Sequence, residues 1–214
     1  QLFRGFEQML KGRDPRDVVL FTQRICGICS AAHSIAASMA QQEAFQIRPT
    51  PTGQALFNLI FAADMIQNHL RHFYLLVLPD YAIGNEIPLS HLQPKDDYRL
   101  PEKQNKELLS HIKGAIYISA RAHEMLAIFG AKAPHQQTIM ASGVTEQASP
   151  ERLVAYRSIL REISDWVKNI YIPDVLTIAE YYSDYYTIGQ GYGNFISFGM
   201  FPDPITQKRR LPSG

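Results

Sequence analysis

The chain has 214 residues, enough for one large domain or two small ones around a substantial hydrophobic core. Lys and Arg number 21 and Asp and Glu number 20, so the net charge of +1 gives no electrostatic reason to expect nucleic acid or an anionic membrane as a partner. Hydrophobic residues make up 46% and charged residues 19%, which excludes disorder and indicates that a partner covers some of the surface. Two cysteines are too few for a disulfide framework, and no apolar run reaches the ~18 residues that span a bilayer.

The first predicted elements are two helices separated by a proline-rich break. Residues 31–45 are compatible with a helix, and residues 48–53 interrupt it. Thr50 and Pro51 form a suitable N-cap and first-turn pair. Apolar residues then recur every three or four positions, which predicts a helix over 51–78 that ends before Pro79. Its apolar stripe consists of Leu56, Leu59, Ile60, Ala63, Ile66, Leu70, Phe73 and Val77.

The rest of the chain also favours helices. After a loop over 81–101, a second long helix is predicted over 102–129, with Gly130 as its stop. Its inner face would hold Leu108, Leu109, Ile112, Ile116, Met125 and Ile128. Residues 130–143 should be irregular, Ser149 and Pro150 begin a third helix through Val167, and Pro173 interrupts or restarts it. With one strand predicted over 195–198, the expected fold is mainly α, a bundle of long helices with minor β content.

The chemically informative stretch is Arg24-Ile-Cys26-Gly-Ile-Cys29-Ser-Ala-Ala-His33. Two cysteines three residues apart can direct both sulfurs at one ion, and Gly27 would let the backbone turn tightly between them. A helix beginning near Cys29 and the charge of Arg24 would both favour thiolate over thiol. His33 lies one turn after Cys29 on the same helical face, where it could donate a hydrogen bond to that sulfur without binding the ion.

Three other interpretations of the cysteine pair remain open from the residues alone. A dithiol redox pair of the thioredoxin type needs a preceding strand, which residues 14–22 do not clearly offer. A structural zinc site needs four ligands, and His69 and His72 on the long helix could complete a Cys2His2 set within a helical interaction domain. In the third interpretation the two cysteines are buried and inert, but such a pair would need neither the glycine between them nor the histidine downstream.

The pattern Arg-x-Cys-Gly-x-Cys-x-x-x-His resembles the first nickel-binding signature of the large subunit of NiFe hydrogenases. Upstream, Arg4-Gly-Phe-Glu7 resembles another segment of that family at the expected distance from the cysteines. Later segments at 69–74, 130–135 and 191–199 look like further family segments in the right order. Each later segment is weak evidence alone, and the ordered set over nearly the whole chain carries the resemblance.

The resemblance implies roles for individual residues. Cys26 would be a terminal nickel ligand, and Cys29 would bridge nickel to an iron that carries cyanide and carbonyl ligands. His33 would hydrogen-bond near that bridging sulfur. Glu7 matches a family carboxylate that binds a buried magnesium ion close to the site, and this ion prefers oxygen ligands. Asn68 occupies a position over the metals where many members carry Asp.

The implied activity is that of a catalytic large subunit, a nickel-dependent oxidoreductase that oxidises H2 reversibly to protons and electrons. Soft thiolates suit a redox-active nickel ion. Two cysteines cannot hold a chain of iron–sulfur clusters, so a small subunit with clusters would pass electrons to an acceptor and cover part of the apolar surface. The segment Phe73-Tyr74 and the Tyr-rich stretch 181–192 are candidates for that contact. Such large subunits are exported, when they are, on a signal of the small subunit, which would give a periplasmic or membrane-associated enzyme and otherwise a cytoplasmic one.

One departure from the family bears on domain organisation. The second C-x-x-C signature of the family is absent, and two sulfurs cannot complete a tetrathiolate site. We therefore expect residues 1–214 to be the amino-terminal to middle part of a single large-subunit domain, a fragment truncated at both ends. The alternatives are a processed mature chain and a cysteine-depleted relative such as a respiratory-complex subunit. A relative that senses hydrogen, instead of turning it over rapidly, also fits the sequence.

Overall fold

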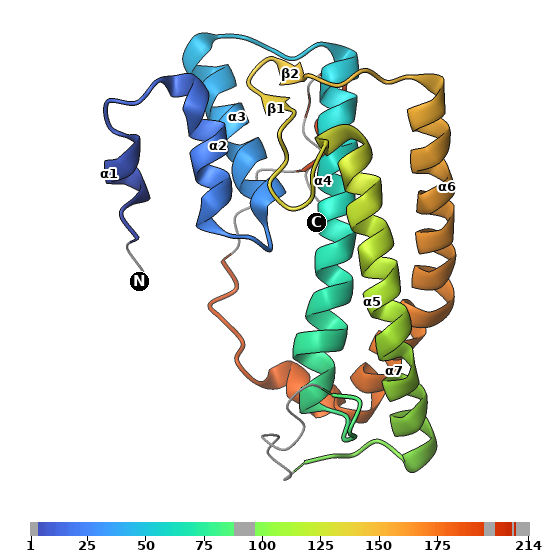
Figure 1. The fold of residues 1–214 in the computed structure, drawn as a ribbon. Coiled ribbons are helices and arrows are strands. Elements are labelled where there is room, and N and C mark those ends of the chain that lie inside the picture. Colours follow the sequence, from blue (N-terminus) through green and yellow to red (C-terminus); the bar gives the residue numbers. More distant parts are fainter. Residues whose placement is uncertain (1–3, 88–96, 195–199, 207, 209–214) are drawn as a thin grey trace. The chain divides into compact units, whose positions relative to one another are not determined.

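The computed structural model describes residues 4–87, 97–194, 200–206 and 208, and in these residues helices dominate (Figure 1). The amino-terminal elements are α1 (Phe6–Leu10), the 3-10 turn η1 (Pro15–Asp17), α2 (Val18–Thr22), the 3-10 turn η2 (Gln23–Ile25) and α3 (Ser30–Phe45). The later helices are α4 (Pro51–Arg71), α5 (Glu102–Gly130), α6 (Pro150–Trp166) and α7 (Ile172–Tyr181), which is followed by the 3-10 segment η7 (Ser183–Thr187). The mainly α class is thus confirmed.

The sheet in the described part of the chain is a hairpin of β1 (Ile139–Met140) and β2 (Gly143–Val144). The strands are antiparallel, with Ile139 opposite Val144 and Met140 opposite Gly143. This hairpin lies in the stretch that was predicted to be irregular, because two strands of two residues are too short to show an alternating pattern. The strand predicted over 195–198 lies outside the described residues.

The described residues group into two compact units. The first unit draws on residues 1–65, 122–158 and 197–214, and the second on residues 66–121 and 159–196. Helices α4, α5 and α6 each contribute residues to both units. Within the described ranges, none of the helices is apolar enough over a sufficient length to cross a membrane.

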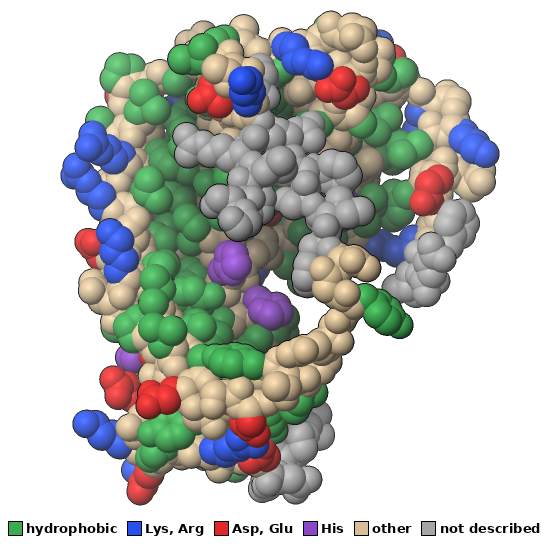
Figure 2. Space-filling view, turned by 180° about the vertical axis from the view of Figure 1, so that it is seen from behind, with side chains coloured by type: hydrophobic (Ala, Val, Ile, Leu, Met, Phe, Trp, Pro, Cys, Tyr) green, Lys and Arg blue, Asp and Glu red, His purple; other side chains and the backbone are tan. Residues whose placement is uncertain are grey.

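Large hydrophobic side chains stay exposed at the surface, as the low charged fraction of the sequence suggested. Val154 on α6, Leu176 on α7 and Ile188 after η7 are 69%, 61% and 68% exposed. On the face seen in Figure 2, hydrophobic side chains make up much of the visible surface.

The predicted helix over 51–78 forms, but its last turns change geometry. The Thr50 hydroxyl accepts a hydrogen bond from the amide of Gly53 at 3.1 Å, which confirms the N-cap. The α-helical part ends at Arg71, and the π-helix η3 (His72–Val77) and the 3-10 turn η4 (Leu78–Asp80) follow. Pro79 has no amide hydrogen, so the carbonyl of Leu75 cannot receive its usual α-helical bond and the helix widens.

A second proline has the same effect in the third helix. α6 begins at Pro150, where the Ser149 carbonyl accepts from the amide of Leu153 at 3.0 Å. The π-helix η6 (Val167–Tyr171) then precedes Pro173, and α7 continues beyond it. The proline therefore widens the helix without ending it.

The second long helix is confirmed as α5, but one of its predicted core residues is wrong. Ile116 is 53% exposed, because the inner face of this turn is formed by Ala115, Ile118 and Ser119. After Gly130, Ala131 takes a left-handed conformation (φ 61°), which ends the helix.

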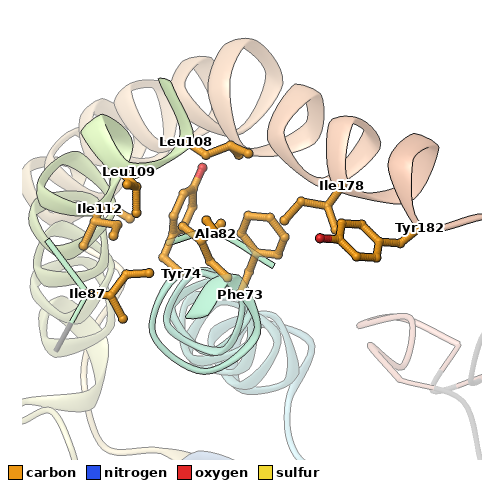
Figure 3. Close-up of a cluster of buried hydrophobic side chains, with 11 residues drawn as sticks. Phe73, Tyr74, Ala82, Ile87, Leu108, Leu109, Ile112, Ile178 and Tyr182 are labelled. Atoms are coloured by element: carbon orange, nitrogen blue, oxygen red, sulfur yellow. The ribbon is translucent and has the colours of Figure 1, made fainter. Parts of the chain in front are cut away.

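The core of the second unit surrounds a buried aromatic pair (Figure 3). Phe73 and Tyr74 contact each other edge to face, with ring centroids 4.9 Å apart. They are 6% and 1% exposed, so the prediction that they contact a small subunit is wrong. They instead pack with Leu78, Ala82, Ile87, Leu108, Leu109, Ile112, Ala115, Ile178 and Tyr182.

A buried polar cluster lies next to this core. The Tyr74 hydroxyl donates to the Asp174 carboxylate, and Nδ1 of His111 lies 2.8 Å from the same Asp174 oxygen. Burial raises the pKa of Asp174, although its bonds with Tyr74 and His111 act in the opposite direction. Helix α7 is thereby joined to η3 and α5 through one carboxylate.

A second polar cluster fastens the loop after α5 to the start of α3 in the first unit. The Ser30 hydroxyl accepts from the amide of His135 at 3.0 Å and from Nε2 of Gln136 at 3.5 Å. Nε2 of Gln23 donates to the Gln136 carbonyl at 2.8 Å. Gln23, Ser30 and Gln136 are almost completely buried, so water cannot reach their polar groups. The hydrogen bonds between these residues supply partners in place of water.

We predict that Ser30→Ala lowers the free energy of unfolding by about 1 to 3 kcal/mol, because the amide of His135 and the buried side chain of Gln136 lose their shared acceptor. Urea-induced unfolding measures this loss. Ser110→Ala is the matched control, since its exposed hydroxyl bonds only to the carbonyl of Glu107 in its own helix. Equal stability of the two variants would contradict the assigned role.

We predict that Tyr74→Phe lowers the free energy of unfolding by about 1 to 3 kcal/mol, because the buried Asp174 carboxylate then keeps only one of these two partners, His111. Thermal and urea unfolding are the measurements, with Tyr192→Phe as the control at a fully exposed tyrosine. A Tyr74→Phe protein as stable as the wild type would show that this bond contributes nothing to stability.

Candidate metal centre

The two cysteines lie on the short connection between η2 and α3. Cys26 is extended (φ −146°, ψ 133°), and Cys29 immediately precedes the first residue of α3 (φ −114°, ψ 37°). Both are half-buried free thiols. The amide and the thiol of Cys29 both act on the Cys26 thiol, so the two cysteines are close neighbours.

The two thiols differ in their proton affinity. Hydrogen bonds from the amide and thiol of Cys29 lower the pKa of Cys26, and the amide of Ile28 and the charge of Arg4 add to this. Burial, the neighbouring Cys26 sulfur and the charge of Asp64 raise the pKa of Cys29 to about 11. The lowered pKa of Cys26 agrees with the expected preference for thiolate, whereas at Cys29 burial outweighs the effect of the helix terminus and favours the thiol.

Arg4 joins the amino-terminal segment to the cysteine loop. Its guanidinium donates to the carbonyl of Ile25, the residue before Cys26, and lies 5.2 Å from the centroid of the Phe6 ring. The sequence pointed to Arg24 as the cation near the sulfurs. In the structure Arg24 is exposed, and its charge helps to lower the pKa of His135 instead.

The structure gives no steric reason for glycine at position 27. Its φ lies outside the left-handed region, and a Cβ atom there would meet no described atom within 4 Å. The tight turn that the sequence suggested is thus made without a conformation that needs glycine.

The other predicted site residues lie on three different elements. His33 is half-buried one turn into α3, and its amide donates to the Cys29 carbonyl at 3.3 Å. Glu7 is exposed in the first turn of α1, close in sequence to Arg4. Asn68 is half-buried near the end of α4. The hydrogen bond from His33 to sulfur and the metal roles of Glu7 and Asn68 stay predictions.

Asp64 is the residue near the cysteines that the sequence interpretation missed. It lies on α4, is 4% exposed, and its charge acts on the Cys29 thiol. Its position four residues after Ile60 on the apolar stripe is the signal that could have identified it. An acidic residue at an inward-facing helix position rarely lacks a structural or chemical role.

The structure does not support the alternatives to a nickel site. Residues 14–22 form the helical turns η1 and α2, so the strand that a thioredoxin-type pair needs is not there. Among the described residues, no three His, Cys, Asp or Glu side chains are grouped to hold a metal ion. A closed Cys2His2 zinc site is thus not observed, and the cysteine pair offers two soft donors of an incomplete set.

Comparison with known proteins places these features in a family. The chain matches the nickel-dependent hydrogenase family over residues 4–85 and 89–214. It is 37% identical to the periplasmic NiFeSe hydrogenase large subunit of Desulfomicrobium baculatum, over 98% of this chain and 43% of that protein. It is 29% identical to the quinone-reactive Ni/Fe-hydrogenase large chain of Wolinella succinogenes, over 94% of this chain and 44% of that one.

The fold agrees with these sequence matches. The oxidised Ni-Fe-Se hydrogenase of D. vulgaris Hildenborough superposes with a TM-score of 0.90 at 38% identity, covering 98% of this chain and 44% of that one. The chain therefore spans less than half the length of these relatives. A helical fold shared over almost all of its residues, with two free thiols in the family pattern, shows that the chain belongs to the nickel-dependent hydrogenase family.

Proposed function

We propose that this chain is the amino-terminal to middle part of the large subunit of a NiFe hydrogenase, which catalyses H2 ⇌ 2 H+ + 2 e−. The observation that carries the proposal is the pair of free, adjacent sulfurs of Cys26 and Cys29 within a chain of this family. The family membership supports nickel as the metal. Iron with cyanide and carbonyl ligands, and magnesium, are the finer parts of the proposal.

Cys26 and Cys29 would hold the metals, and their surroundings fit that task. Cys26 would be the terminal nickel ligand, because the amides of Cys29 and Ile28 already stabilise negative charge on its sulfur. Cys29 would bridge nickel and iron, an arrangement in which two cations replace its proton. When bound, such a metal pair supplies redox chemistry toward H2. We assign the remaining ligands to the part of the large subunit that this chain does not span.

The chain's own residues would fix and tune these ligands. Arg4 holds the backbone at Ile25 and places positive charge beside Cys26. Ser30 anchors the first residue of α3 to the loop at His135, so the cysteine connection is held at both ends. His33 would donate to the bridging sulfur from one turn along the helix. Asn68 would present a neutral amide where many relatives carry a carboxylate.

Glu7 would bind a magnesium ion near the same corner of the first unit. A carboxylate suits this ion, and the bond between Arg4 and Ile25 brings the beginning of α1 to the cysteine connection. The exposure of Glu7 leaves its oxygens accessible to a cation.

The proposed enzyme works with a small subunit that carries iron–sulfur clusters and passes electrons to an acceptor. Its relatives are large chains by name, which supports such a partner. The exposed apolar side chains of α6 and α7 would supply surface for contacts in the assembled enzyme.

One relative is periplasmic and another is quinone-reactive, so we propose a periplasmic or membrane-associated enzyme.

We predict that Cys26→Ser and Cys29→Ser each reduce bound nickel at least tenfold in the full-length protein with its small subunit. A hydroxyl is a harder and less acidic ligand than a thiol, so it cannot replace the sulfur. Metal analysis and infrared spectra of iron-bound diatomic ligands are the measurements. Ile28→Ala, which changes an exposed side chain between the cysteines, should keep its metals. One zinc ion in the wild type, without infrared bands, would end the proposal.

We predict that Glu7→Gln lowers the magnesium content of the same protein and leaves nickel unchanged, because a neutral amide binds magnesium more weakly than a carboxylate. Glu43→Gln, at an exposed acid paired with Arg48, is the control. An unchanged magnesium content would remove Glu7 from the site.

Turnover with an artificial electron acceptor separates an enzyme from a hydrogen sensor.

A further inference from the structure

A cavity in the first unit has a wall that is partly apolar and partly made of buried amides. Its volume is about 70 Å³, and it is bounded by α3, by α4 and by residues 200–202, all of which belong to the first unit. None of the residues that line it has a role in the proposed metal centre. The apolar part of the wall consists of Ile35, Met39, Phe57, Phe61, Met200 and Phe201.

Two glutamines supply amides whose oxygen atoms have no partner. Gln42 of α3 and Gln54 of α4 both line the cavity and are 8% and 6% exposed. Nε2 of Gln42 donates to the Ser38 hydroxyl at 3.4 Å, and Nε2 of Gln54 donates to Oδ1 of Asn58 at 3.0 Å. Within the described part of the chain, neither Oε1 atom accepts a hydrogen bond. A buried acceptor without a donor costs free energy, so these two oxygens require one.

Residues 200–202 form a cover over the cavity from a distant part of the sequence. Nδ2 of Asn58 donates to the Pro202 carbonyl at 2.9 Å, and the rings of Phe61 and Phe201 lie with their centroids 5.7 Å apart. Since Asn58 also accepts from Gln54, the amide wall and the cover belong to one hydrogen-bonded group. The cover is therefore held in place by specific contacts with α4.

The size and the chemistry of the cavity select its occupant. One water molecule needs about 10 to 15 Å³ of such space, so a cavity of about 70 Å³ accommodates more than one. An apolar cavity stays dry and accepts apolar guests such as xenon, whereas unpaired polar groups in the wall favour water. The described residues that line this cavity are all uncharged, which disfavours an ion because a buried charge needs a partner.

We propose that this cavity is an internal hydration site, in which ordered water molecules donate hydrogen bonds to Oε1 of Gln42 and to Oε1 of Gln54. The water joins α3 to α4 and, through Asn58, connects both helices with the cover. It supplies the donors that the two amides do not find in the protein. The inference goes beyond the proposed function and does not depend on it, because none of its residues would bind the proposed metals.

The test is a high-resolution crystal structure of the full-length large subunit with its small subunit, determined with and without xenon pressure. The proteins are the wild type, the double variant Gln42→Met/Gln54→Met, and Gln147→Met as a control at an exposed glutamine of the first unit. Methionine has nearly the length of glutamine but no amide, so the double variant keeps the cavity and makes its wall apolar.

In the wild type we expect water at about 2.7 to 3.2 Å from both Oε1 atoms and no xenon in the cavity. The double variant should lose these water molecules and bind xenon, and Gln147→Met should match the wild type.

Several results would overturn the inference. They are a wild-type cavity that is dry, that binds xenon, that holds a side chain from outside residues 1–214, or whose water reaches only one of the two amides. A double variant that keeps the same water molecules would also overturn it. If the double variant does not fold, the wild-type crystal alone decides. All of these outcomes leave the proposed function intact, because that function is tested by nickel and iron content.

Discussion

The position of the cysteine connection depends on hydrogen bonds that join the residues at its two ends to distant parts of the sequence. On one side, Arg4 binds the carbonyl of Ile25. On the other, Ser30 binds the loop that contains His135 and Gln136. The connection itself has no regular structure between η2 and α3, so its own backbone bonds cannot fix it. Two thiols can share one ion only when their distance is held, and these contacts anchor the residues on either side of the cysteine pair.

These contacts also make the two thiols chemically different. Cys26 receives hydrogen bonds, while Cys29 donates one and lies where burial and Asp64 oppose its ionisation. A terminal ligand and a bridging ligand have different needs, because the bridge shares its charge between two cations. The different surroundings of the two thiols are compatible with the different roles proposed for them.

The sequence predicted the long helices well because their signals are local and repeated. Periodic apolar residues, the cap at Thr50 and the stop at Gly130 each act within a few positions, and the structure follows them. The sequence could not give the widened turns before Pro79 and Pro173, since a proline can end a helix or merely loosen it, depending on the packing beyond it. The hairpin at 139–144 was missed because four strand residues carry no periodicity.

At the candidate site, the motif predicts two cysteine ligands but says little about their environment. The spacing of Cys26 and Cys29 is written in the sequence, whereas the partners Arg4, Ser30 and Asp64 come from residues up to 35 positions away in the helices and loops around them. Long-range electrostatics of this kind arises only on folding, so the sequence pointed to the neighbouring Arg24, whereas the structure shows the charge of Arg4 acting on Cys26. The sequence also suggested that the turn between the cysteines needs glycine at position 27. In the structure Gly27 has a backbone conformation that other residues adopt. The proton affinities of the two thiols therefore depend on which groups the fold places near them, and Asp64 of α4 is one of these groups at Cys29.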